Sequence, residues 1–210
     1  MSFTDAVKRP FQDFKTLIIG IIVMIIPIVN LIGIGYFLEC ARTSLKKDKK
    51  LPEFKDWLNL FIKGLVAAVI GIIYAIPVLI ILALTVGTAV LTGGASALTG
   101  MQGAALMQTL ATLGIGFVIT LVVAAIVSLI SSAAMIRYAE KGNFGSAFEL
   151  SVLMKKAFTG KYFAAWFISM LYSLAVVIIL SFIPVVGTLI GAFVVGVTTY
   201  TYLAEAYRSA

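Results

Sequence analysis

The segment Tyr162–Ala204 reads YFAAWFISMLYSLAVVIILSFIPVVGTLIGAFVVGVTTYTYLA and contains no charged side chain. As a single helix its 43 residues would be about 65 Å long, whereas the hydrocarbon core of a bilayer is about 30 Å thick. The chain must therefore turn. Pro184 and Gly187 mark the turn, because proline lacks a backbone donor and glycine permits a positive φ. Two membrane helices are predicted, over about 162–182 and 188–207.

The composition of the whole chain agrees with a lipid environment. Of the 210 residues, 61% are hydrophobic and 12% are charged, compared with about 45–50% and about 25% in a soluble domain. An ordinary water-soluble globule is therefore excluded. We predict an all-α polytopic transmembrane helix bundle that forms a single integral membrane domain, residues 1–210.

A second uncharged run, Gly64–Ile136, has 73 residues. Its most polar and glycine-rich stretch is Thr92–Gly103, TGGASALTGMQG, which is typical of an exposed turn. The run therefore predicts a helical hairpin, with arms over about 64–91 and 104–136.

The run Thr16–Leu38 has 23 residues, enough for one span or for a short hairpin. An internal repeat favours the hairpin, because Ile26–Gly33 (IPIVNLIG) is similar to Ile183–Gly191 (IPVVGTLIG). Asn30 takes the place of glycine, and asparagine is the next most tolerant of a left-handed turn conformation. This hairpin would turn at Pro27, with arms over about 10–26 and 31–45.

Six helices are therefore predicted, and two alternatives stay open. A single kinked first span would give five helices and an outside N-terminus. In the other alternative, the first hairpin is a shallow re-entrant wedge, because arms of about 16 residues are only about 25 Å long.

The basic residues fall in a few short windows between the uncharged runs, and the net charge is +7. With six helices, all 16 Lys and Arg residues lie on one face. Lys and Arg collect on the cytoplasmic side of membranes. We therefore predict the cell (cytoplasmic) membrane as the location and cytoplasmic N- and C-termini. The same distribution indicates membrane contact and no nucleic-acid partner.

Two amphipathic stretches are predicted at the cytoplasmic surface, over 52–63 and 146–158. In the first, Phe54, Trp57, Leu58 and Phe61 share one helix face. The second begins with a capping box, Ser146 to Glu149. Such helices lie in the membrane interface; alternatively, the first packs its apolar face under the bundle. The candidate contacts for lipid headgroups or a partner are Lys46, Lys47, Lys49, Lys50, Trp57, Lys155 and Lys156.

The repeat continues as Tyr-x-x-Glu-x-x-Arg, which places Glu39 three residues before Arg42 and Glu205 three residues before Arg208. Residues at this spacing are neighbours on a helix, so two cytoplasmic ion pairs are predicted. Exposed pairs of this kind contribute little to stability. They are interpreted as helix-surface contacts, with a partner or headgroup site as the alternative.

Chemistry is limited by what the chain lacks. It has no His and one cysteine, Cys40. Histidine is the commonest general base and metal ligand near neutral pH, and a lone cysteine cannot form an internal disulfide. No carboxylate falls near the predicted midplane, where an ion-coupled transporter would need one. We therefore predict no catalytic, metal-binding or cofactor-binding residue, no cofactor and no enzymatic activity.

Three segments resemble an uncharacterised, mainly archaeal family of membrane proteins, the domain of unknown function DUF4013. They are LPEFKDWLNLFIKGL (51–65), PIVNLIGIGY (27–36) and RYAEKGNFGSAFEL (137–150). The resemblance implies a multi-pass fold and brings no activity or site residue with it. The sequence thus favours a non-enzymatic membrane scaffold or accessory subunit. Its expected partners are membrane lipids, further copies of the chain or another membrane protein. The alternative is a small oligomeric transporter or permease for an uncharged or lipidic solute.

Overall fold

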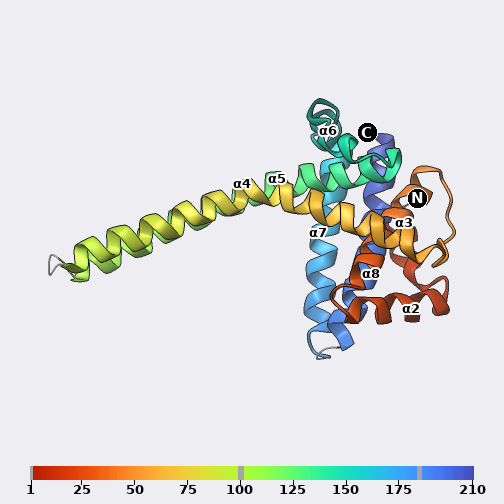
Figure 1. Ribbon diagram of the computed structural model, residues 1–210, viewed down its shortest axis with the longest axis horizontal. Helices are drawn as coiled ribbons and strands as arrows, with labels where there is room; N and C mark the ends of the chain where they lie inside the picture. Colours follow the sequence, from red (N-terminus) through yellow and green to blue (C-terminus); the bar gives the residue numbers. More distant parts are fainter. Residues whose placement is uncertain (1, 99–101, 184–185) are drawn as a thin grey trace. The chain divides into compact units, whose positions relative to one another are not determined.

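The computed structural model describes residues 2–98, 102–183 and 186–210, and within these ranges every regular element is helical (Figure 1). The all-α prediction is therefore confirmed. In chain order the elements are α1 (Phe3–Lys8), the 3₁₀ helix η1 (Arg9–Phe11), α2 (Phe14–Ile25), α3 (Asn30–Leu45), α4 (Trp57–Leu98), α5 (Gln102–Lys141), the 3₁₀ helix η2 (Phe144–Phe148), α6 (Leu150–Ala157), α7 (Gly160–Leu180) and α8 (Val186–Ser209).

Within the described residues, four helices are long and apolar enough to cross a membrane. They contain the segments Trp57–Gly94, Leu106–Lys141, Gly160–Leu180 and Val186–Ser209. The polytopic prediction is thereby supported in its coarse form. α2 is apolar but has only 12 residues, too few for about 30 Å of hydrocarbon. The six-helix count and the re-entrant alternative stay predictions.

The chain divides into two compact units, which are described separately. Unit 1 comprises Met1–Ile70 and Leu129–Ala210, and unit 2 comprises Gly71–Ser128. At the centre of unit 1 is α8, which packs against α1, α2, α3 and α7. In its apolar stretch 44% of the residues are buried, compared with 6–11% in the other three spans. α8 is therefore the helix around which unit 1 is assembled.

Aromatic stacking fills the core between α3 and α8. The rings of Tyr36 and Phe54 stack with their centroids 4.1 Å apart, and Phe193 lies 5.8 Å from Tyr36. The Tyr36 hydroxyl donates to the Pro52 carbonyl at 2.8 Å, so its polar end is satisfied. This cluster ties the segment between α3 and α4 to the core of unit 1.

Within the described residues, unit 2 consists of α4 from Gly71 onward and of α5 up to Ser128. A methyl group on Gly116 would overlap the side chain of Thr85, so the two helices approach closely at this glycine. Thr85 and Thr120 donate to carbonyls four residues earlier, at 2.9 and 2.7 Å. These hydroxyls are thus satisfied within their own helices, as a hydrocarbon environment requires.

The structure corrects the turns that were predicted from glycine and asparagine. Pro27 lies in a turn as expected. Asn30, however, is the first residue of α3, and its backbone N–H donates to the Ile26 carbonyl at 2.8 Å. Gly187 lies in the first turn of α8 without a positive φ. It is small because a methyl group there would overlap the Leu180 carbonyl. Pro184 lies outside the described residues.

The predicted turn over 92–103 is largely helical. α4 continues to Leu98 and α5 begins at Gln102, and residues 99–101 lie outside the described residues. The hydroxyl of Thr92 donates to the Thr88 carbonyl at 2.8 Å. Threonine and glycine therefore continue the helix here, where their composition had indicated a loop.

The predicted extent of the first amphipathic helix, residues 52–63, is wrong. Residues 52–56 are not helical, and α4 begins at Trp57. Asp56 has a positive φ of 54°. Its carboxylate accepts from the backbone N–H of Asn59 at 3.3 Å, which caps the helix. The ring of Phe54 consequently packs on Tyr36 inside unit 1. Trp57 stays 45% exposed.

The second amphipathic stretch divides into η2 and α6. The predicted capping box does not form, because both side chains have other partners. The Ser146 hydroxyl donates to the Asn143 carbonyl at 2.5 Å, and the Glu149 carboxylate binds Arg137 at 2.6 Å. A capping box does form at Ser2 and Asp5, at the start of α1.

Candidate functional site

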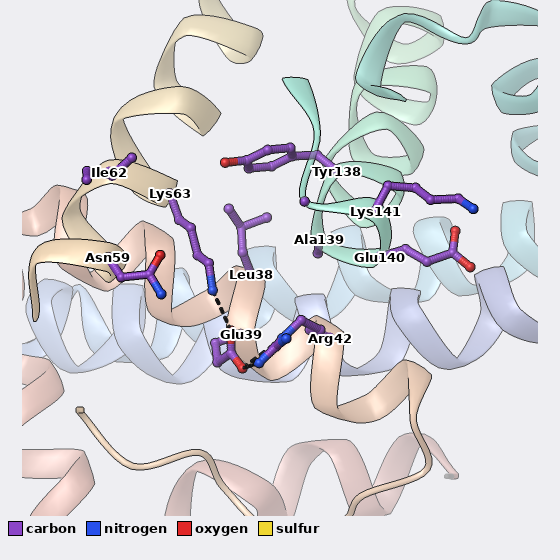
Figure 2. Close-up of a pocket in the computed structure, with 11 residues that line it drawn as sticks. Leu38, Glu39, Arg42, Asn59, Ile62, Lys63, Tyr138, Ala139, Glu140 and Lys141 are labelled. Carbon is purple, nitrogen blue, oxygen red and sulfur yellow. Dashed lines mark hydrogen bonds and ion pairs between the residues drawn. The ribbon is translucent and has the colours of Figure 1, made fainter. Parts of the chain in front are cut away.

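A charged site in unit 1 that joins two helices is built around Glu39 on α3. Its Oε1 accepts two hydrogen bonds from Arg42, at 2.9 and 2.6 Å, and its Oε2 accepts one from Lys63 on α4 at 3.0 Å (Figure 2). The predicted pair between Glu39 and Arg42 is thus present. Lys63, which sequence spacing did not connect to it, adds a second cation and joins α3 to α4.

A pocket of about 290 Å³ opens beside this cluster. It is lined by α3, by the first turns of α4 and by the end of α5 (Figure 2). The lining residues are Leu38, Glu39, Arg42, Asn59, Ile62, Lys63, Tyr138, Ala139, Glu140, Lys141 and Gly142. Charged heads and apolar side chains therefore face the same small volume.

The Glu39 carboxyl is held in its ionised form. Burial alone would raise its pKa, but the hydrogen bonds from Arg42 and Lys63 outweigh burial and lower the pKa below its ordinary value of 4.5. A carboxyl with a lowered pKa stabilises the fold above its unfolded pKa, and this stabilisation is lost as the pH falls through the folded pKa.

Replacing Glu39 with Gln should therefore flatten the acid limb of the stability curve. In wild-type protein the melting temperature should fall as the pH drops from 7 to about 3.5, while Glu39→Gln starts lower and changes less. Thermal unfolding in detergent at a series of pH values measures this. The control is Glu53→Gln, which removes an exposed pair with Lys55 and should leave the curve unchanged. A Glu39→Gln curve parallel to that of wild type would contradict the assignment.

The second half of the repeat forms the corresponding pair on α8. Arg208 donates to the Glu205 carboxylate at 2.5 Å, and Glu205 is 7% exposed. A second pocket, of about 390 Å³, lies beside it and is lined by Lys161, Ala165, Tyr202, Glu205, Ala206 and Ser209. Both predicted ion pairs are therefore present, each next to a pocket.

The predicted headgroup contacts occupy different environments. Four of them, Lys46, Lys47, Lys49 and Lys50, are exposed after the end of α3, and Lys155 is exposed on α6. Lys156 is half-buried. Its ammonium donates to the Tyr207 carbonyl at 3.2 Å and lies 5.3 Å from the centre of the Tyr207 ring. Lys156 thus fixes α6 to the end of α8, while the exposed lysines have heads that reach solvent.

Arg9 is a buried residue whose central position in the structure the sequence pattern did not predict. Its side chain is fully buried, and its guanidinium donates to six oxygens from α3, the loop after it and α8. The acceptors are the carbonyls of Cys40, Asp48 and Lys50 and the hydroxyls of Thr43, Ser44 and Thr201. All are neutral. In the sequence Arg9 is one of several juxtamembrane cations, so no local signal singles it out.

The described residues offer binding groups and little reactive chemistry. Burial raises the pKa of the Cys40 thiol to about 12, which keeps it protonated and a poor nucleophile. No cluster of three or more Cys, Asp or Glu residues that could hold a metal ion occurs in the described part of the chain. What this site can do is bind charged or amphipathic groups.

Comparison with known proteins gives a family and no activity. No curated protein and no solved structure matches the chain. The family described as "Protein of unknown function (DUF4013)" matches residues 18–185. This match runs from within α2 to beyond the end of α7 and includes the cluster of Glu39, Arg42 and Lys63. The chain, a helical protein with four helices able to span a membrane, therefore belongs to the uncharacterised DUF4013 family.

Proposed function

We propose that the protein is a non-enzymatic membrane scaffold or accessory subunit that binds lipid or a partner protein. The observation that carries the proposal is the surface of unit 2. Its large apolar side chains face outward, with Leu91 74% exposed and Met107 71% exposed. Its threonine hydroxyls bond to their own helices. A surface of this kind suits lipid tails or another apolar helix, whereas an aqueous pore needs free polar groups.

The lengths of the hairpin helices also support a docking role. The apolar segments of α4 and α5 have 38 and 36 residues. A helix of this size is about 55 Å long, almost twice the thickness of the hydrocarbon core. A span that only crossed the bilayer would need about 20 residues. The additional length provides contact surface for a second protein.

The orientation in our proposal has both termini and the exposed lysines on the cytoplasmic side of the cell membrane. It follows from the collection of Lys and Arg in the juxtamembrane windows. Cysteine labelling in intact cells tests it: a thiol at Asn30→Cys should react with an impermeant maleimide, and one at Lys47→Cys should react only after lysis. The native Cys40 is fully buried and provides an unreactive background. Labelling of Lys47→Cys in intact cells would contradict the orientation.

A second candidate function, a small oligomeric permease for an uncharged or lipidic solute, is favoured by one observation. The buried hydroxyls of Ser169 on α7 and Thr198 on α8 have no hydrogen-bond partner among the residues that the structure describes. Unpaired hydroxyls in a span are groups to which a polar solute or water can bond.

Photo-crosslinking in the native membrane separates the two functions. A benzophenone side chain at Met107 should give a discrete protein adduct, whereas one at Ile179 on α7, 65% exposed, should give lipid adducts alone. Glycerol flux and lipid scrambling in reconstituted vesicles should equal those of empty vesicles. Flux that disappears in Ser169→Ala and Thr198→Val would overturn the scaffold function in favour of the permease.

A further inference from the structure

We propose that the pocket between α3, α4 and the end of α5 binds the phosphodiester of an anionic lipid headgroup. The inference rests on the proposed lipid-binding function and assigns it a site. The residues that would hold the phosphate are Arg42 and Lys63, which lie outside the exposed lysines that the sequence had singled out.

The cluster beside the pocket has an excess of positive charge. Two cations, Arg42 and Lys63, share one carboxylate, and both oxygens of Glu39 are occupied by them. The bonds to Glu39 use Nε and Nη2 of Arg42 and one donor of Lys63, so within the described part of the chain Nη1 and two ammonium hydrogens remain for a ligand. The side chains of Arg42 and Lys63 are 45% and 25% exposed, so a ligand can reach them.

The carboxylate between the two cations keeps them in position. Glu39 is only 15% exposed in its side chain, and its bonds to Arg42 and Lys63 orient both heads beside the pocket. A guanidinium and an ammonium held in this way match a phosphate, which offers several acceptor oxygens. Preorganisation of this kind lowers the entropic cost of binding.

The other charged residues of the pocket do not cancel this excess. Glu140 accepts from Arg137 at 2.9 Å, and Arg137 also binds Glu149, so it offsets only part of the Glu140 charge; the adjacent Lys141 adds a positive charge to the same part of the lining. In Figure 2 the heads of Glu140 and Lys141 point away from Lys63. The side of the pocket formed by α3 and α4 therefore carries the anion-binding groups.

The rest of the lining fits the lower part of a headgroup. Leu38 and Ile62 contribute apolar surface, and the Asn59 side chain contributes an amide. A volume of about 290 Å³ lies at the small end of ligand pockets, which are about 300–1,000 Å³. This combination suits a charged group that continues into a less polar part, such as a glycerophosphate.

The position along the helices agrees with a lipid source. Lys63 lies less than two turns from the start of the span Trp57–Gly94, and Lys141 ends the span Leu106–Lys141. The pocket is therefore at span ends, where headgroups lie. Next to it, Ile62 and Leu65 on α4 are 50% and 46% exposed, and they offer apolar surface to acyl chains. A free anion would make no use of this surface.

Lipid titration followed by native mass spectrometry tests the site in the full chain. Wild-type protein in mild detergent should bind one phosphatidylglycerol more tightly than phosphatidylcholine. Replacing both Arg42 and Lys63 with Gln should weaken phosphatidylglycerol binding about thirtyfold, because each basic residue contributes about fivefold near a headgroup. The matched control is Lys8→Gln with Lys15→Gln, which removes two exposed cations elsewhere and should change binding less than about threefold.

A second variant keeps every charge and addresses folding. Asn59 is exposed at the pocket, so Asn59→Phe should fill the mouth without disturbing the core. It should weaken lipid binding about tenfold while the melting temperature stays at that of wild type. Unchanged binding in Asn59→Phe would overturn the site even if the double variant were unstable.

The remaining outcomes separate the site from the proposed function. Wild-type affinity in the double variant, with lipid still bound, would overturn the pocket and leave lipid binding to the exposed lysines. Competition by inorganic phosphate at the same concentration as lipid would overturn the lipid source and assign a free anion. No lipid binding at all would overturn the inference, whereas the adduct from Met107 would still support the scaffold.

Discussion

Replacing Arg9 with Ala should lower the free energy of unfolding by about 3–5 kcal/mol, because a buried hydrogen-bonded cation leaves its partners unsatisfied when it is removed. Six acceptors from α3, the following loop and α8 would lose their donor together. The melting temperature in detergent should fall by about 10 °C. Thermal unfolding followed by circular dichroism measures this.

Two variants show whether the loss comes from the guanidinium. Arg9→Lys keeps the charge but has three donors for six acceptors, so it should recover less than half of the lost stability. Lys8→Ala removes the neighbouring exposed cation and should change the melting temperature by no more than about 2 °C. Equal effects of Lys8→Ala and Arg9→Ala would mean that the loss of stability comes from the change in net charge rather than from the hydrogen bonds of Arg9.

Adding one methyl group at Gly35 or Gly64 should destabilise unit 1 by about 3 kcal/mol in each case. These glycines lie where α3 crosses the start of α4. A methyl on Gly35 would overlap the Leu60 carbonyl, and one on Gly64 would overlap the Leu31 carbonyl. The clashes are with backbone, which no side-chain rotation relieves, so the helices must separate.

The chain offers a matched control for these glycine variants. Gly87 also lies inside α4, but nothing is within 4 Å of the position that a methyl group would occupy. Gly87→Ala should therefore leave the melting temperature unchanged or raise it, because alanine favours a helix more than glycine does. Gly35→Ala and Gly64→Ala should also make the Glu39 cluster less stable, since separation of α3 and α4 moves Lys63. Wild-type stability in both variants would contradict a tight crossing.

Local spacing and composition were sufficient to predict part of this structure. Uncharged length predicted the four long apolar helices, because the thickness of a bilayer sets how many residues a span needs. The two Glu–Arg pairs were predicted because their partners are one turn apart on the same helix. These features depend on residues close together in sequence.

Features that join distant residues were not predictable in this way. Lys63 binds Glu39 from 24 residues away, and Arg9 bonds to oxygens 31 to 192 residues later. The helical period of Phe54, Trp57 and Leu58 predicted a helix from residue 52, but α4 begins at Trp57 after the positive φ of Asp56, and Phe54 stacks on Trp57 from outside the helix. That break depends on how the segment packs against Tyr36, which periodicity does not describe.

The bond between Arg9 and Thr201 has a consequence for biosynthesis. The arginine leaves the ribosome early, and its α8 acceptor follows 192 residues later. Until α8 is in place, the guanidinium lacks part of its binding site and the core of unit 1 lacks its central helix. Closing so long a loop is slow and comes late. Five of the six acceptors lie within 41 residues of Arg9, so the N-terminal segment can bind α3 and the following loop first, and its site is completed only when the last helix has entered the bundle.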